Sequence, residues 1–132
     1  MTTDIVGPGG SPMSVAVISV TEMERSLQFY RDITGLTADP PAIWAGPDFE
    51  AFWHLPAGST GNAVFLHHGP DPVGRILLVQ FDAKDRKVVR AAKPARAYGL
   101  INLNFYTGDI FGETEKLKKA GYEFWSEPVA HD

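Results

Sequence analysis

The chain contains no cysteine, which excludes thiol chemistry, disulfide bonds and cysteine-ligated metals. Positive charge is also scarce: 12 Lys and Arg face 16 Asp and Glu, so binding to a nucleic-acid backbone is disfavoured. The longest clean aliphatic run, Ile76–Val79, is far too short to cross a bilayer, and the N-terminus lacks the basic start and apolar stretch of a signal peptide. We therefore expect a cytoplasmic protein with no nucleic-acid or membrane partner.

What the chain does contain is enough apolar material for one core. Of its 132 residues, 44% are hydrophobic and 21% are charged, which leaves no room for two independent domains. Segment 1–12 is rich in glycine and proline and is expected to form a flexible N-terminal arm.

A degraded internal repeat organises the rest of the chain. The first copy is an alternating strand at 15–20 followed by an amphipathic helix at 21–35. The second copy is a strand at 101–106 followed by a helix at 109–121. A duplicated unit of this kind predicts a cavity shared between two similar halves.

The first helix carries signals at both ends. Thr21, with Glu24 three residues later, predicts a capping box, and Gly35 predicts a left-handed C-cap. An apolar face at helical spacing is formed by Met23, Leu27, Tyr30 and Ile33. This face predicts that the helix packs on a sheet.

Three further strands are expected between the two copies: one at 42–44 or 49–54, one at 63–67 and one at 75–81. Segment 82–99 then carries half of the basic residues of the chain. We interpret it as a solvated linker between modules, with an anion or partner patch as the alternative.

These features resemble the vicinal oxygen chelate superfamily, which includes glyoxalase I, extradiol dioxygenases, methylmalonyl-CoA epimerase and the bleomycin-resistance proteins. The resemblance rests on the opening strand and on the Arg25-Ser26, Phe29-Tyr30 and Gly35-Leu36 pairs that follow it. Residues 14–81 match a whole βαβββ module, and residues 100–132 match the start of another. The resemblance implies an α+β fold in which one module and a partial second copy form a mixed, curved sheet shaped like a cup.

We accordingly expect a single domain at 13–132. It comprises a complete first module at 13–81, a basic linker at 82–99 and a truncated second module at 100–132. The last of these has room for only one strand after its helix, at 122–125, so its half-sheet would be unfinished. We expect further sequence or a second subunit, as in a homodimer, to complete it.

The resemblance also implies metal-ligand positions on the opening and last strands of each module. Three of the four can be located, at Val15, Leu77 and Asn102, and none is His or Glu. Valine and leucine have no lone pair, and one amide oxygen cannot hold iron, zinc or nickel against water. We therefore predict no metal cofactor, with a divalent metal as the alternative.

The histidines are weak candidates for metal ligands; they are His54, His67, His68 and His131. The adjacent pair would point to opposite faces of an extended strand unless the chain turns at Gly69-Pro70.

The expected ligand site is the concave face of the sheet. Alternation predicts an apolar wall from the first module, formed by Val15, Val17, Leu77 and Val79. It predicts a polar ladder from the second module, formed by Asn102, Asn104 and Tyr106. Near the expected rim lies an aromatic cluster, on a loop that could fold over a ligand: Trp44, Phe49, Phe52 and Trp53.

The sequence therefore predicts a metal-free small-molecule binding protein that resembles the bleomycin-resistance members and takes a small apolar or aromatic ligand. The alternative is a metalloenzyme like a glyoxalase, extradiol dioxygenase or epimerase, with ligands from outside the chain or from other positions. A third possibility is a noncatalytic module paired with another chain. No catalytic residue can be named from the sequence.

Overall fold

The computed structural model describes residues 13–84, 86–87 and 103–129, and the chain divides into two units, Met1–Lys87 and Val88–Asp132. The predicted N-terminal arm, most of the predicted linker and Asn102 lie outside the described residues.

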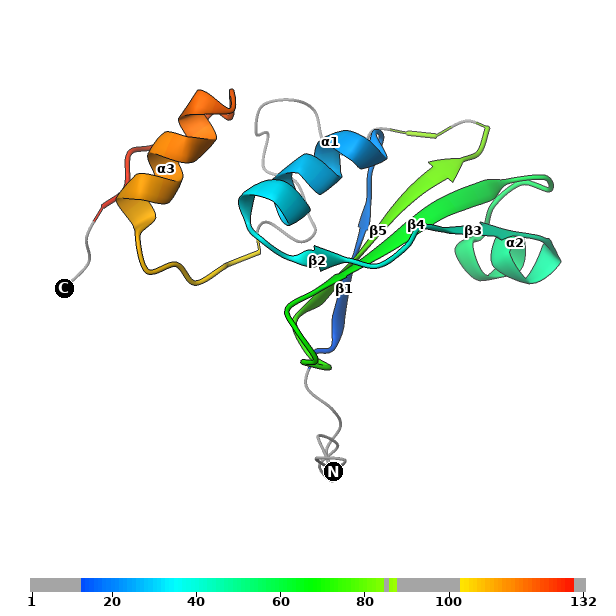
Figure 1. The fold of residues 1–132 in the computed structure, drawn as a ribbon. Helices are drawn as coiled ribbons and strands as arrows, with labels where there is room; N and C mark the ends of the chain where they lie inside the picture. Colours follow the sequence, from blue (N-terminus) through cyan, green and yellow to red (C-terminus); the bar gives the residue numbers. More distant parts are fainter. Residues whose placement is uncertain (1–12, 85, 88–102, 130–132) are drawn as a thin grey trace. The chain divides into compact units, whose positions relative to one another are not determined.

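The first unit is a mixed α+β module built on one five-stranded sheet (Figure 1). Its strands are β1 (Val15–Ser19), β2 (Thr37–Ala38), β3 (Ala42–Ala45), β4 (Thr60–His67) and β5 (Arg75–Asp82). The order is β1-β5-β4-β2, and β3 also pairs with β4. Strand β1 runs parallel to β5, whereas the other pairs are antiparallel. This arrangement confirms the expected βαβββ module with a mixed sheet.

Strands β2 and β3 are two pieces of one edge. Ala38 pairs with Leu66 near one end of β4, and Ala42 pairs with Ala63 further along the same strand. Between the pieces lies the pair Pro40-Pro41, whose nitrogens carry no hydrogen and cannot continue the ladder. The strand expected at 42–44 is thus confirmed, and the alternative at 49–54 is wrong because that segment is helical.

One face of the sheet is covered by α1 (Met23–Leu27), which continues directly as the π-helical η1 (Gln28–Ile33). Met23 and Leu27 are buried, as the apolar helical face predicted. Alternate strand residues on the covered face are also buried: Val64, Leu66, Ile76 and Leu78. This layer is the main core of the unit.

Of the two end signals predicted for the first helix, the structure confirms one and not the other. Gly35 adopts the expected left-handed conformation, with φ of +81°. The capping box at Thr21 and Glu24 is absent, because the N-cap residue is Glu22 and it makes no side-chain cap. The amide of Met23 instead donates to Gln80 Oε1 of β5 at 2.6 Å. A hydrogen-bond acceptor from another part of the chain thus replaces the predicted side-chain cap.

The second unit is described from Leu103 to Val129 and contains α3 (Ile110–Lys119). Asp109 caps this helix by accepting a hydrogen bond from the amide of Gly112 at 2.9 Å, and Gly121 follows its end with φ of +89°. Both ends of the predicted helix are therefore confirmed. The described residues include no helix long and apolar enough to span a membrane.

Neither strand expected in the second unit forms within its described residues. Residues 103–106 and 122–125 have no strand pairing. A strand needs a partner for its backbone hydrogen bonds, and alternation in the sequence does not supply one.

Candidate functional site on the concave face

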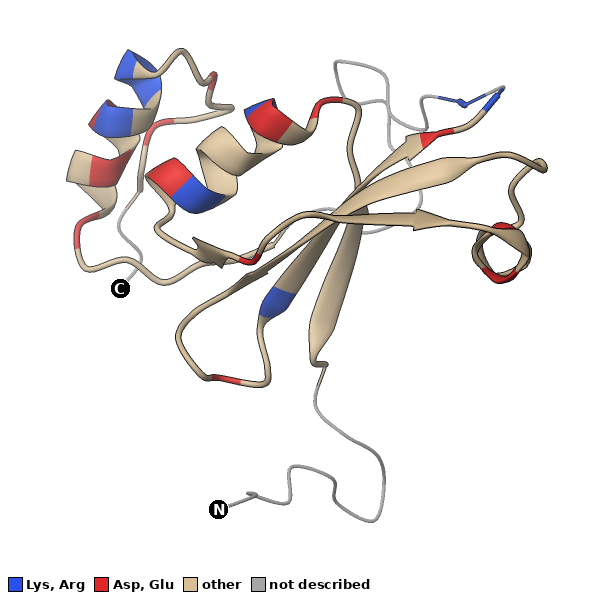
Figure 2. Cartoon of the chain, turned by 45° about the vertical axis from the view of Figure 1, so that its right-hand side comes forward, with Lys and Arg blue, Asp and Glu red and all other residues tan. Residues whose placement is uncertain are grey.

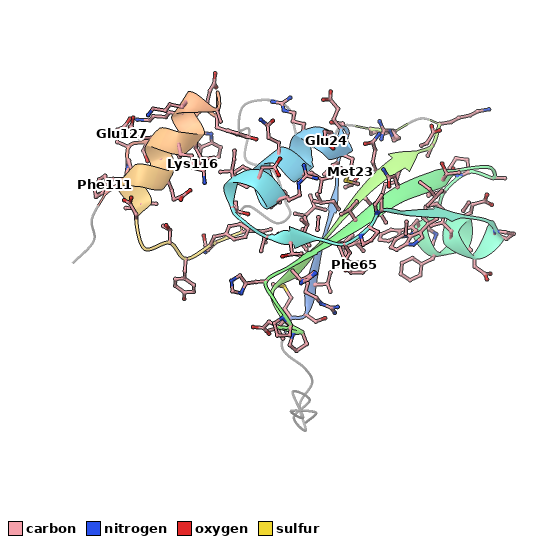
Figure 3. All side chains as sticks on the ribbon, in the orientation of Figure 1. Met23, Glu24, Phe65, Phe111, Lys116 and Glu127 are labelled. Carbon is pink, nitrogen blue, oxygen red and sulfur yellow. The ribbon has the colours of Figure 1, made fainter. Side chains whose placement is uncertain are left out.

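The face of the sheet opposite α1 is apolar, and we call it the cup face. Strand register places Val17 beside Leu77, Leu77 beside Phe65, and Val79 beside Ala63, so these side chains share one side. Three of them are buried and form a cluster, against which four partly buried side chains pack: Val15, Trp44, Phe65 and Phe81. Figure 3 shows Met23 and Phe65 on opposite sides of the sheet. The cup face is thus distinct from the main core.

The aromatic cluster belongs to a helix and not to the expected loop. Helix α2 (Pro47–Trp53) begins after Gly46, whose φ is +100°, and carries Pro47 in its first turn. Asp48 and Glu50 lie in that turn, where negative charge complements the helix dipole. Phe49, Phe52 and Trp53 have i, i+3, i+4 spacing, the signal that could have identified the helix from the sequence.

Gly61 lets α2 approach the sheet closely. A Cβ atom at this position would lie 2.9 Å from Phe49 Cζ. The Phe49 ring consequently lies close to β4, and its centroid is 6.1 Å from that of Phe81 at an interplanar angle of 27°. Trp53 meets the same Phe81 ring edge to face at 5.4 Å. These contacts fix α2 beside the cup face.

An open hollow of about 620 Å³ lies between α2 and the cup face. That volume is within the range of small-molecule sites, about 300–1,000 Å³. Its lining is largely aliphatic and aromatic and comprises Val17, Ile43, Trp44, Ala45, Asp48, Phe49, Phe52, Trp53 and Leu77. Val17 is 48% exposed and Phe52 is 73% exposed, so much of this apolar surface faces solvent.

The structure brings the predicted apolar wall together. Val17 and Leu77 line the hollow, whereas Val15 and Val79 pack in the cluster beside it. The aromatic residues singled out near the rim also line the hollow: Trp44, Phe49, Phe52 and Trp53.

The predicted polar ladder is not seen as a strand. Asn104 and Tyr106 are exposed residues of a segment of the second unit that is not assigned to a strand, and Asn102 lies outside the described residues. The alternation that suggested the ladder is therefore not realised at 103–106, while the role of these side chains in binding stays a prediction.

Two of the positions where the family places metal ligands can be inspected. Val15 pairs with Arg75, and Leu77 pairs with Val17, so no neighbour in the register supplies a ligand atom in their place. Within the described ranges, no three His, Cys, Asp or Glu side chains come together as a metal site. The residues at these two positions do not fit the metal that the family implies. The metal-free state stays a prediction, because Asn102 is not described.

At the far end of β4 and β5, His67, a weak metal-ligand candidate in the sequence, forms a polar group with Asp39 that the sequence did not predict. His67 Nδ1 donates to the carbonyl of Gly69 at 2.8 Å, and its Nε2 lies 2.8 Å from Asp39 Oδ1. The Gly69 carbonyl first, and then the Asp39 carboxylate, raise the pKa of His67 because both accept hydrogen bonds from the protonated ring. The positive charge of Arg75 acts on the same pKa in the opposite direction.

Arg75 belongs to the cup face and was also missed. It shares the alternation of Leu77 and Val79 on β5, the sequence signal that could have found it. Its guanidinium carbon lies 5.8 Å from the centroid of the Phe65 ring. The arginine therefore stands at one end of the apolar surface whose other end is covered by α2.

A second hollow, of about 640 Å³, lies on the helix side of the sheet, where Met23, Leu27 and Val64 contribute to its lining. Its cation, Arg31, is already paired with Asp32 at 2.7 Å and with Glu24 at 3.2 Å. Its described lining includes no aromatic side chain. The cup face is the stronger candidate for binding, because it combines aromatic surface with apolar strands.

Comparison with known proteins gives consistent results. A family model described as Glyoxalase/Bleomycin resistance protein/Dioxygenase superfamily matches residues 13–132. Among solved structures, a glyoxalase family protein from Bacillus cereus is similar, with a TM-score of 0.79 and 22% sequence identity over 91% of this chain and 78% of that one. No curated protein matches the chain. At 22% sequence identity, this structural similarity is evidence for a shared fold alone.

Proposed function

Since the chain belongs to the Glyoxalase/Bleomycin resistance protein/Dioxygenase superfamily, we propose that it binds a small aromatic or acyl molecule in the hollow between α2 and the cup face, without a transition metal. The observation that carries this proposal is an apolar, solvent-open hollow whose lining includes Leu77, one of the positions where the resemblance places a metal ligand. Val17 and Leu77 offer contact area and no ligand atom.

The driving force is burial of exposed apolar surface. Ile43 is 71% exposed, and Val17 and Phe52 are also exposed, so a ligand that covers these side chains gains about 25 cal/mol for each Å² removed from water. Aromatic rings of the ligand can also pack edge to face or offset against the α2 rings, at about 0.5–1.5 kcal/mol per pair. Binding of this kind needs no chemical step.

The test uses 2-naphthamide, a neutral aromatic probe, and two-dimensional ¹H–¹⁵N NMR. We expect the largest shift changes at Val17, Leu77 and the residues of α2. Val17→Asp should weaken binding, since it places a charge at the wall, while the 48% exposure of Val17 keeps the fold intact. The matched control is Val129→Asp, at an exposed valine of the second unit.

Metal content separates this proposal from a metalloenzyme. Elemental analysis of protein purified without chelators should find no stoichiometric iron, zinc, nickel or manganese. A stoichiometric metal that is lost on mutating Asn102 or His67 would favour the glyoxalase-like or dioxygenase-like alternative. A shift footprint confined to 84–96, or to the second unit, would show that the cup face is not the site.

A further inference from the structure

Arg75 is the only Lys or Arg in the five strands of the sheet. Strands β1 to β4 contain none, and β5 contains Arg75 at its start and Asp82 at its end. In Figure 2 the strands are accordingly tan apart from blue at one place and red at another. Asp82 lies at the other end of β5, so it does not explain the cation at Arg75. That cation requires an explanation, because placing charge against apolar side chains is costly unless the charge is paired.

The protein does not supply that pair among its described residues. Arg75 Nε is buried and has no hydrogen-bond partner there, and no ion pair involves this side chain. The nearby carboxylate of Asp39 faces His67, whose Nε2 it approaches to 2.8 Å. Within the same part of the chain, the contact that the guanidinium does make is with the Phe65 ring, at 5.8 Å.

Arg75 also lies within reach of the proposed site. It precedes Leu77, which lines the hollow, by two positions on β5, so their Cα atoms are about 7 Å apart. Both side chains are on the cup face, where Arg75 pairs with Val15 and Leu77 pairs with Val17. A ligand whose rings cover Val17 and Leu77 can therefore extend along the strand to the guanidinium.

The charges fix the direction of such a ligand. Asp48 lines the hollow at the α2 end and would repel an anionic group there. The opposite end carries the permanent charge of Arg75, together with a His67 whose pKa is raised. We propose that the ligand of the cup face is an aromatic carboxylate, with its rings toward α2 and its carboxylate bound by Arg75.

This inference rests on the proposed function and adds the charge and orientation of the ligand. Guanidinium and carboxylate form charge-assisted, often bidentate hydrogen bonds, which are among the stronger polar contacts in proteins. Removing such a partner typically changes affinity by about ten- to a hundredfold. The expected signature is a loss of affinity that depends on the ligand's charge and leaves its apolar contacts unchanged.

The experiment compares 2-naphthoate with 2-naphthamide, which have the same rings and differ in charge, by calorimetric titration. Wild type should bind the carboxylate at least about tenfold more tightly than the amide, and raising the salt concentration should weaken only the carboxylate. Arg75→Met should remove the preference and leave amide affinity unchanged, and Arg75→Lys should keep part of it. The matched control, Arg25→Met, removes a cation from the exposed side of α1 and should change neither affinity.

The inference is wrong if wild type binds both probes equally and without salt dependence, a result that does not require any variant to fold. It is also wrong if Arg25→Met weakens 2-naphthoate as much as Arg75→Met does, because net charge alone would then explain the effect. In either case, amide binding that is lost in Val17→Asp would leave the proposed function intact. Failure of the amide to produce a footprint on the cup face would instead overturn the proposed function itself.

Discussion

Gly61 and Phe49 form a pair whose coupling can be measured, because one ring occupies the space where a β-carbon would be. Replacing Gly61 with valine places its Cβ about where Phe49 Cζ now approaches to 2.9 Å, and two further methyl groups follow. Such overpacking typically costs about 1–3 kcal/mol of unfolding free energy. The backbone itself does not oppose the change, since Gly61 is a strand residue outside the left-handed region.

Gly61→Val should have the opposite effect on the unfolding free energy when the Phe49 ring has been removed. Phe49→Ala alone should destabilise by about 2 kcal/mol, less than the roughly 3–5 kcal/mol typical of fully buried aromatic truncations, because Phe49 is only partly buried. In that background Gly61→Val meets no ring. It should then stabilise by about 0.5–1 kcal/mol, since valine favours a strand and glycine does not. The coupling energy should therefore be about 1.5–4 kcal/mol.

Urea unfolding of the four proteins, followed by far-UV circular dichroism, measures this cycle. Trp fluorescence is less suitable, because Trp44 lies 6.3 Å from Phe49 between ring centroids and would report the mutation directly. The reasoning is refuted if Gly61→Val costs the same free energy with and without the Phe49 ring. That result would mean that α2 is not held against β4 in the way described.

Three further outcomes are expected. Gln80→Met should lower the unfolding free energy by about 1 kcal/mol, since the amide of Met23 loses its acceptor, whereas Gln80→Glu keeps an acceptor and should retain most of the stability. An equal loss of unfolding free energy in both variants would contradict the capping role of Gln80. The raised pKa of His67 stabilises the folded protein fully below the ordinary pKa of 6.5, and this stability is lost as the pH rises through the pKa of His67 in the folded protein. Asp39→Asn should bring the His67 pKa, measured by NMR titration, closer to 6.5. An unchanged His67 pKa would contradict the pairing with Asp39. Asn102→Leu should weaken a hydrogen-bonded ligand by about 1–3 kcal/mol with little change in melting temperature, and equal affinity would remove Asn102 from the site.

Local signals in the sequence determined the elements whose physics is local. Alternation predicted β1, and runs of strand-forming residues bounded by glycine- and proline-rich turns predicted β4 and β5. Asp109 and Gly121 predicted the ends of α3, since a cap and a left-handed residue act within a single turn. Alternation also grouped Val17 with Val15 and Leu77 with Val79, because the side to which each side chain points is set within its own strand. The register of β1 against β5 places the two groups on one face.

Only the tertiary structure decided features that depend on partners distant in sequence. The amide of Met23 is capped by Gln80, 57 positions away, so the local capping box was not needed. Segment 103–106 alternates well, yet it is not part of a strand in the described structure, because alternation in the sequence does not by itself supply a neighbouring strand. Arg75 became a candidate because Phe65 lies beside it and no described carboxylate pairs with it, and pairing across strands cannot be read from either strand alone.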